Sequence, residues 1–110
     1  MSVKMSETEM EALYNKAMLA GKVAMEFCGV EEMRDACGFA WVNVRPGTSR
    51  FAKFLKAKKY ARSDEYYGGV TIWIRGDGGQ SVRRKEAYAD AVASVMSDAG
   101  VDAYSMSRLD

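Results

Sequence analysis

Residues 38–55 have the sequence GFAWVNVRPGTSRFAKFL and contain a strand, a turn and the start of a helix. In Gly38–Val44, β-branched and aromatic residues dominate, and apolar side chains occur at both odd and even positions. This pattern predicts a strand that is buried on both faces. Pro46 and Gly47 end the strand, because proline has no amide hydrogen to donate and glycine turns freely.

A helix is predicted directly after this turn, with Thr48 or Ser49 as its N-cap. Its apolar side chains fall within about a third of the circumference; they are Phe51, Phe54 and Leu55. The opposite side carries Lys53, Lys56 and Lys59. Lys58 projects towards the apolar side, so we expect the helix to fray there or the lysine to extend its ammonium group to solvent.

The N-terminal segment predicts a longer helix. Ser6 and Glu9 have the spacing of a capping box. Apolar residues then recur at three- and four-residue steps from about Glu7 to about Cys28, and Gly29 is the predicted stop.

The second half of the chain predicts a strand, a helix and a final strand. In Val70–Arg75, valine and isoleucine alternate with threonine, tryptophan and arginine, which is the period of a strand. The glycine-rich residues 76–79 predict a turn. Ser81 is placed to cap a helix that ends at Gly100, and Val101–Ser107 is the last predicted strand.

The order α-β-α-β-α-β predicts an α+β fold, a two-layer sandwich in which helices pack on a small sheet. We expect a mixed sheet of about three strands. All 110 residues are assigned to one domain, because this length supports a single core. Residues 1–35 form its acidic N-terminal helix and loop, and residues 36–110 form its β-α-β-α-β core.

Charge is unevenly distributed along the chain although the net charge is only +1. Residues 45–62 carry seven basic side chains and no acidic one, whereas residues 1–35 and 63–110 each hold three more acids than bases. A surface patch of one sign attracts an oppositely charged partner whatever the net charge is.

Motifs that specify a reaction are absent from the sequence. Without histidine there is no Ser-His or Cys-His nucleophile pair, and the spacing of Cys28 and Cys37 fits no common zinc pattern. Neither a P-loop nor a dinucleotide fingerprint is present. We therefore expect no catalytic residue, no metal and no cofactor, and we favour a binding protein over an enzyme.

The subcellular location is predicted from the lack of a signal region and of a membrane-spanning segment in the sequence. The N-terminus has no apolar signal region, and the longest apolar runs are far short of a membrane span. Reduced, buried thiols are the favoured interpretation of the two cysteines. These observations predict a cytoplasmic protein without a membrane partner.

The basic stretch is the strongest positive feature. Its predicted binding face comprises Arg45, Arg50, Lys53, Lys56, Lys59 and Arg62, and the predicted stacking residues are Tyr60, Tyr66 and Tyr67. Proteins that bind single-stranded nucleic acid combine a basic groove with aromatic stacking. An acidic protein surface is the other partner considered. The alternative is a solvated helix face that binds nothing.

A second basic cluster lies at the start of the third predicted helix. Ser81, Arg83, Arg84 and Lys85 follow a glycine-rich turn, where free backbone amides and cations together favour an anion. The alternative is that Arg83 and Arg84 pair with acidic residues of the first helix.

Large aromatic residues are expected to pack in the core or on the sheet; they are Phe39, Trp41, Phe51, Phe54 and Trp73. Trp73 has the parity of Thr71 and Arg75, so it is alternatively exposed beside them. An exposed tryptophan on a small sheet indicates a contact surface, for instance in a homodimer.

Four stretches resemble a family of small uncharacterised proteins of tailed bacteriophages, including T4-like ones: GFAWVNVRPGTSRFAKFL, YYGGVTIWI, QSVRRKEAYADAVASVMSDAG and SRLD. The resemblance covers roughly residues 36–110 and leaves out the acidic first helix. It implies a phage-encoded accessory protein that acts in the infected bacterial cell, and it brings no assigned activity.

Three hypotheses about function follow. The favoured one is a non-enzymatic protein whose basic face engages nucleic acid or an acidic host protein, in a host-modulating or anti-defence role among others. The second is an assembly protein that self-associates through its sheet or first helix. The third is a small enzyme acting on a phosphate-bearing ligand at Gly76–Lys85.

Overall fold

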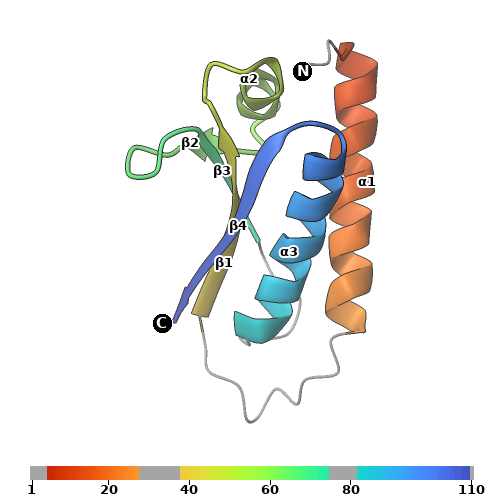
Figure 1. Cartoon of the computed structure of the whole chain (residues 1–110), viewed down its shortest axis with the longest axis vertical. Helices are drawn as coiled ribbons and strands as arrows, with labels where there is room; N and C mark the ends of the chain where they lie inside the picture. The colour runs from red at the N-terminus through yellow and green to blue at the C-terminus, as the bar shows by residue number, and fades with distance from the viewer. Residues whose placement is uncertain (1–4, 28–37, 75–81, 110) are drawn as a thin grey trace.

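The computed structural model describes residues 5–27, 38–74 and 82–109 (Figure 1). Its helices are α1 (Glu7–Glu26), α2 (Arg50–Ala57) and α3 (Val82–Asp98). Its strands are β1 (Gly38–Arg45), β2 (Arg62–Ser63), β3 (Val70–Trp73) and β4 (Asp102–Leu109). From β1 onward the order is β-α-β-β-α-β, the connectivity of split βαβ folds.

The predicted α+β class is confirmed, with differences in the sheet. Its strand order is β2-β3-β1-β4, and the described pairs are all antiparallel, whereas we predicted a mixed sheet of about three strands. The additional strand is β2, which has only two residues and carries no period that the sequence could reveal. The hairpin that β2 forms with β3 reverses the chain, so that β3 runs antiparallel beside β1.

One face of the sheet is covered by helices. Figure 1 shows α3 packed along the sheet and α1 running antiparallel beside α3. The inner face of the sheet consists of small and branched aliphatic side chains, which share one core with the buried stripes of α1 and α3; these side chains are Ala40, Val42, Val44, Val70, Ile72 and Ile74. Burial of such side chains is the main favourable term in folding.

The predicted start of α1, start of α2 and stop of α3 agree with the structure, whereas α1 ends at Glu26 with Phe27 as its C-cap, before the predicted end near Cys28. The Ser6 hydroxyl accepts a hydrogen bond from the Glu9 amide (3.1 Å), and the Glu9 carboxylate accepts one from the Ser6 amide (2.9 Å). Ser49, rather than Thr48, caps α2. Gly100 has a φ of 90° after α3, which suits its predicted role as the C-terminal stop.

Several predictions fall outside the described residues: the thiols of Cys28 and Cys37, the stop at Gly29, the turn at 76–79 and the Ser81 cap. Within the described part of the chain, no helix has both the length and the apolar character needed to cross a bilayer.

Candidate nucleic-acid interface

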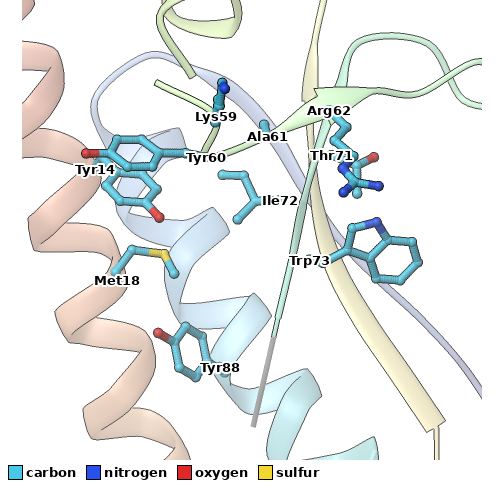
Figure 2. Close-up of a pocket in the computed structure, with 10 residues that line it drawn as sticks. All are labelled: Tyr14, Met18, Lys59, Tyr60, Ala61, Arg62, Thr71, Ile72, Trp73 and Tyr88. Atoms are coloured by element: carbon cyan, nitrogen blue, oxygen red, sulfur yellow. The ribbon is translucent and has the colours of Figure 1, made fainter. Parts of the chain in front are cut away.

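The face of the sheet opposite the helices is mainly aromatic and basic, and it also carries Asn43, Thr71 and the acidic Asp102. Because side chains alternate along a strand, the residues between those of the inner face point to this side. We define the outer face by its eight aromatic, sulfur-containing and basic side chains: Phe39, Trp41, Arg45, Arg62, Trp73, Tyr104, Met106 and Arg108. Figure 2 shows Arg62 and Trp73 on one side of β3 and Ile72 on the other.

Aromatic rings on this face form a connected cluster. The ring centroids of Trp41 and Trp73 lie 5.1 Å apart, and those of Phe39 and Trp73 lie 6.4 Å apart in an edge-on arrangement. Tyr67 approaches Trp41 to 6.4 Å from the β2–β3 loop. These neighbouring rings cover Trp41, which is only 7% exposed, whereas its cross-strand neighbour Trp73 is 47% exposed. The cluster thus presents a wide aromatic surface to solvent.

Cationic side chains lie against these rings. The Arg45 guanidinium carbon is 4.6 Å from the centre of the Tyr104 ring, and that of Arg108 is 5.7 Å from the Phe39 ring. Lys85 of α3 places its ammonium 5.6 Å from the Phe39 ring and donates to the Gly38 carbonyl at 3.0 Å. Cation–π contacts of this kind hold a positive charge beside an aromatic surface without neutralising it.

A polar network fixes the β2–β3 loop to one end of the outer face. The Asp64 carboxylate accepts hydrogen bonds from the amides of Tyr66 and Tyr67 (both 2.9 Å) and from the Thr71 hydroxyl (2.7 Å). Asn43, which is fully buried, donates to the Gly68 carbonyl at 2.9 Å.

These contacts also set the charge of the network. The amide hydrogen bond from Tyr67, the hydroxyl of Thr71 and the nearby Arg45 guanidinium hold the pKa of Asp64 below its usual range. Arg45 is itself oriented by donating from Nε to the Asn43 side-chain oxygen. The loop that carries Tyr66 and Tyr67 is thus held by an ionised carboxylate.

The predicted basic face divides into two parts. Arg45 and Arg62 lie on the outer face, whereas Arg50, Lys53 and Lys56 line the exposed side of α2 at the end of the sheet that β1 leads into (Figure 1). Lys59 follows α2 with a φ of 63° and is exposed. Within the described residues, these six side chains form no ion pair, and Lys58 is the paired member of the segment.

The acidic helix α1 contacts the basic segment at one point. Lys58 lies 3.6 Å from the Glu7 carboxylate and 3.8 Å from that of Glu11. The Tyr60 hydroxyl donates to Glu11 at 2.7 Å, and the Tyr60 ring stacks on Tyr14 with a centroid distance of 4.0 Å. Helix α1 therefore neutralises Lys58 and leaves the other cations open.

The three tyrosines predicted to stack on a ligand are separated by the fold. Tyr66 is highly exposed and lies edge-on to Tyr67 with centroids 4.6 Å apart, so these two stand together beside Trp41. Tyr60 lies on the helical side instead. Its hydrogen bond to Glu11 raises the pKa of the Tyr60 hydroxyl.

The predicted anion site at the start of α3 is described only in part. Ser81 lies outside the described residues. Arg83 is exposed and Arg84 half-buried in the first turn. The Lys85 side chain turns towards β1, where its ammonium lies near the Phe39 ring of the outer face.

A pocket of about 430 Å³ lies between α1, α3 and the edge of β3. Figure 2 shows the stacked Tyr14 and Tyr60 on one side of it and Ile72 across from them. Its described lining contains no carboxylate, thiol or imidazole, and its titratable side chains are tyrosines and the basic Lys59 and Arg62. Within the described part of the chain, no group of acidic or cysteine side chains is arranged to hold a metal ion.

The part of the outer face that β4 contributes was not predicted from the sequence. Tyr104 and Arg108 lie in the final strand, whose side chains the sequence could not assign to a face, and their position depends on the pairing of β4 with β1. Asp64 is a common residue type in a loop, and Asn43, although asparagine is uncommon in strands, carries no signal of its partner in the sequence. The one available signal was the parity of Trp73, which permitted its exposure.

Comparisons with protein-family models, curated proteins and solved structures give no match. The resemblance to bacteriophage proteins therefore stays a prediction.

Proposed function

We propose that the protein binds single-stranded nucleic acid on the outer face of its sheet. The observation that carries the proposal is the coincidence of the solvent-exposed aromatic cluster around Trp73 with the arginines of the same face. Contiguous exposed apolar patches, especially those rimmed by polar residues, are typical of interaction sites. Bases offer flat apolar faces that such rings bind, and phosphates offer charges that the arginines bind.

Stacking supplies the first part of the binding energy. Each base stacked on an aromatic side chain contributes roughly 1–3 kcal/mol, and every base has such a face. Trp73 and the rings of Phe39 and Tyr104 are each partly exposed on neighbouring strands. Successive unpaired bases can therefore lie across the strands, while a duplex keeps its bases stacked on one another.

The cations supply the second part. Arg45, Arg62 and Arg108 surround the aromatic cluster, and the basic side of α2 continues from the Arg45 end of β1. Contacts with phosphates release counterions, so the affinity falls as salt rises. Guanidinium groups held against rings also stack on bases.

An analogy at the level of architecture points the same way. Some RNA-binding domains use one open face of a four-stranded sheet, whose aromatic side chains stack two or three bases. A shared architecture does not establish a function, so the proposal rests on the side chains. The phage resemblance adds a setting to this proposal, in which the protein acts in an infected bacterial cell.

Fluorescence anisotropy with a labelled single-stranded oligonucleotide tests the proposal. We expect saturable, salt-sensitive binding by the wild type and a loss of about 5- to 150-fold in Trp73→Ala, which corresponds to one stacked base. Leu19→Ala is the matched control, because Leu19 is a large apolar side chain that is exposed on α1. We expect this variant to bind like the wild type.

Three outcomes would contradict the proposal. Equal binding by wild type and Trp73→Ala places any nucleic-acid contact elsewhere. Absence of binding, together with capture of an acidic protein by the same face, assigns the surface to a protein partner. Self-association that Trp73→Ala abolishes assigns the surface to an assembly role.

A further inference from the structure

We propose that β4 is a dimerisation edge, which pairs antiparallel with β4 of a second copy of this chain. The strand lies at the end of the sheet order and has eight residues. It pairs with β1 in unbroken register, without a bulge and without a proline. In most proteins a bulge or a proline protects a long edge strand, because its free backbone groups otherwise recruit another strand. The edge at β4 has neither of these two features.

The hydrogen-bond pattern shows which backbone groups face outward. The Ile74 amide donates to the Ala40 carbonyl, so Ala40 bonds towards β3 and its neighbour Trp41 bonds towards β4. Trp41 is paired with Met106, and backbone groups alternate sides along a strand. The amides and carbonyls of Ala103, Ser105 and Ser107 therefore point to the free edge.

Ala103 supports this assignment independently. Its carbonyl accepts a hydrogen bond from the Ser97 hydroxyl at 3.4 Å, so it is directed away from β1. The hydroxyls of Ser105 and Ser107 are bound by Asp90 and Glu86 of α3. These side-chain bonds do not involve the outward amides, and among the described residues no other strand pairs with this edge.

One register of the two strands is self-complementary. With the twofold axis at Ser105, each outward-facing residue forms a hydrogen-bonded pair: Ser105 with Ser105 of the second copy, and Ala103 with its Ser107. Asp102 then lies opposite Arg108 of the second copy, twice by symmetry, and Tyr104 lies opposite its Met106. These are non-hydrogen-bonded pairs, in which side chains approach most closely.

The neighbouring registers lack this match. An axis at Tyr104 places Asp102 opposite Met106, and an axis at Met106 places Arg108 opposite Tyr104. The neighbouring registers also pair outward backbone groups, but only the axis at Ser105 places Asp102 and Arg108 opposite each other. The symmetric assembly is a common one for a self-complementary surface.

Dimerisation through this edge joins the two sheets into one. The outer faces of both copies then lie side by side on the same surface. This arrangement does not require the outer face to bind nucleic acid, and a single strand long enough to cross both faces would gain avidity from it.

Sedimentation equilibrium without nucleic acid tests the proposal. We expect the wild type to approach twice the monomer mass of 12.2 kDa as its concentration rises. Asp102→Arg and Arg108→Asp each place like charges opposite each other, so we expect the dimer dissociation constant to rise roughly tenfold or more. The double variant Asp102→Arg/Arg108→Asp restores opposite charges and is expected to regain the wild-type constant.

Ser105→Pro tests the backbone directly. Proline removes the outward amide of Ser105 and leaves the β1 ladder intact, as proline does on edge strands. We expect a monomer that melts close to the temperature of Ser105→Ala when that control is diluted below its dimer dissociation constant, since association raises the melting temperature of a dimer. A wild type that stays monomeric at high concentration, a dimeric Ser105→Pro variant, or a charge swap that fails to restore the dimer would each overturn the proposal. None of these results bears on base stacking at Trp73.

Discussion

The two faces of the sheet are built from alternate residues of the same strands, yet their chemistry differs sharply. On the inner face, Val42 and Ile72 are aliphatic and almost fully buried under helices. On the outer face, Trp41 and Trp73 occupy the next positions along β1 and β3, and arginines surround them. The inner face is what a stable core requires. The outer face goes beyond that requirement, and this excess is the basis of the proposed binding role.

The largest expected effect concerns stability and belongs to the inner face. Ile72→Ala should lower the free energy of unfolding by about 2–5 kcal/mol, because it leaves a cavity in the core. Trp73→Ala should lower it less, since the Trp73 side chain is about half exposed. Urea denaturation measures both values. A decrease for Trp73→Ala as large as that for Ile72→Ala would show that the outer aromatic cluster serves the fold instead.

The next effect concerns charge beyond the sheet. Lys53→Glu with Lys56→Glu reverses two exposed cations of α2 and should weaken oligonucleotide binding about tenfold. The salt dependence should also flatten, by about 0.7 in slope for each phosphate that no longer has a cationic partner. The matched control is Lys16→Glu with Lys22→Glu, which makes the same change in net charge on α1. Equal weakening in both double variants would show that the lysines of α2 act only through the overall charge of the protein and make no direct contact with phosphates.

A smaller effect concerns the loop that carries Tyr66 and Tyr67. Asp64 has a lowered pKa in the folded protein because Tyr67 and Thr71 donate hydrogen bonds to its carboxylate. Its stabilising contribution is therefore present above the unfolded pKa of about 3.9 and is lost as the pH falls through the lower folded value.

Thermal melts of wild type and Asp64→Asn across this range measure that contribution. We expect the variant to melt earlier at neutral pH and the two melting temperatures to converge below about pH 4. Binding by Asp64→Asn should also weaken, because the loop is released from the sheet. A difference in melting temperature that stays constant down to the lowest pH would contradict the role of the ionised carboxylate.

Local patterns predicted most of the elements. The Ser6–Glu9 capping box, the alternation after Val70 and the Gly100 stop each depend on neighbours in sequence, so the sequence alone reveals them. The strand β2 could not be predicted, because Arg62 and Ser63 are both exposed and form a strand only through pairing with β3.

The candidate site was harder to predict than the fold. The apolar pattern of β1 indicated burial on both faces, and Trp41 is indeed buried, but its cover is Trp73 and Tyr67 in place of a helix. Which residues meet on the outer face depends on pairings between strands far apart in sequence. Tyr104 is brought beside Arg45 only by the register of β4 with β1.

Intrinsic fluorescence offers the most direct test of the central claim. The chain has two tryptophans, Trp41 and Trp73, and both lie in the outer aromatic cluster. Titration of the wild type with an unlabelled single-stranded oligonucleotide should quench this fluorescence saturably, with the dissociation constant that anisotropy gives and with the same sensitivity to salt. Binding seen by anisotropy that leaves the tryptophan emission unchanged would contradict the account.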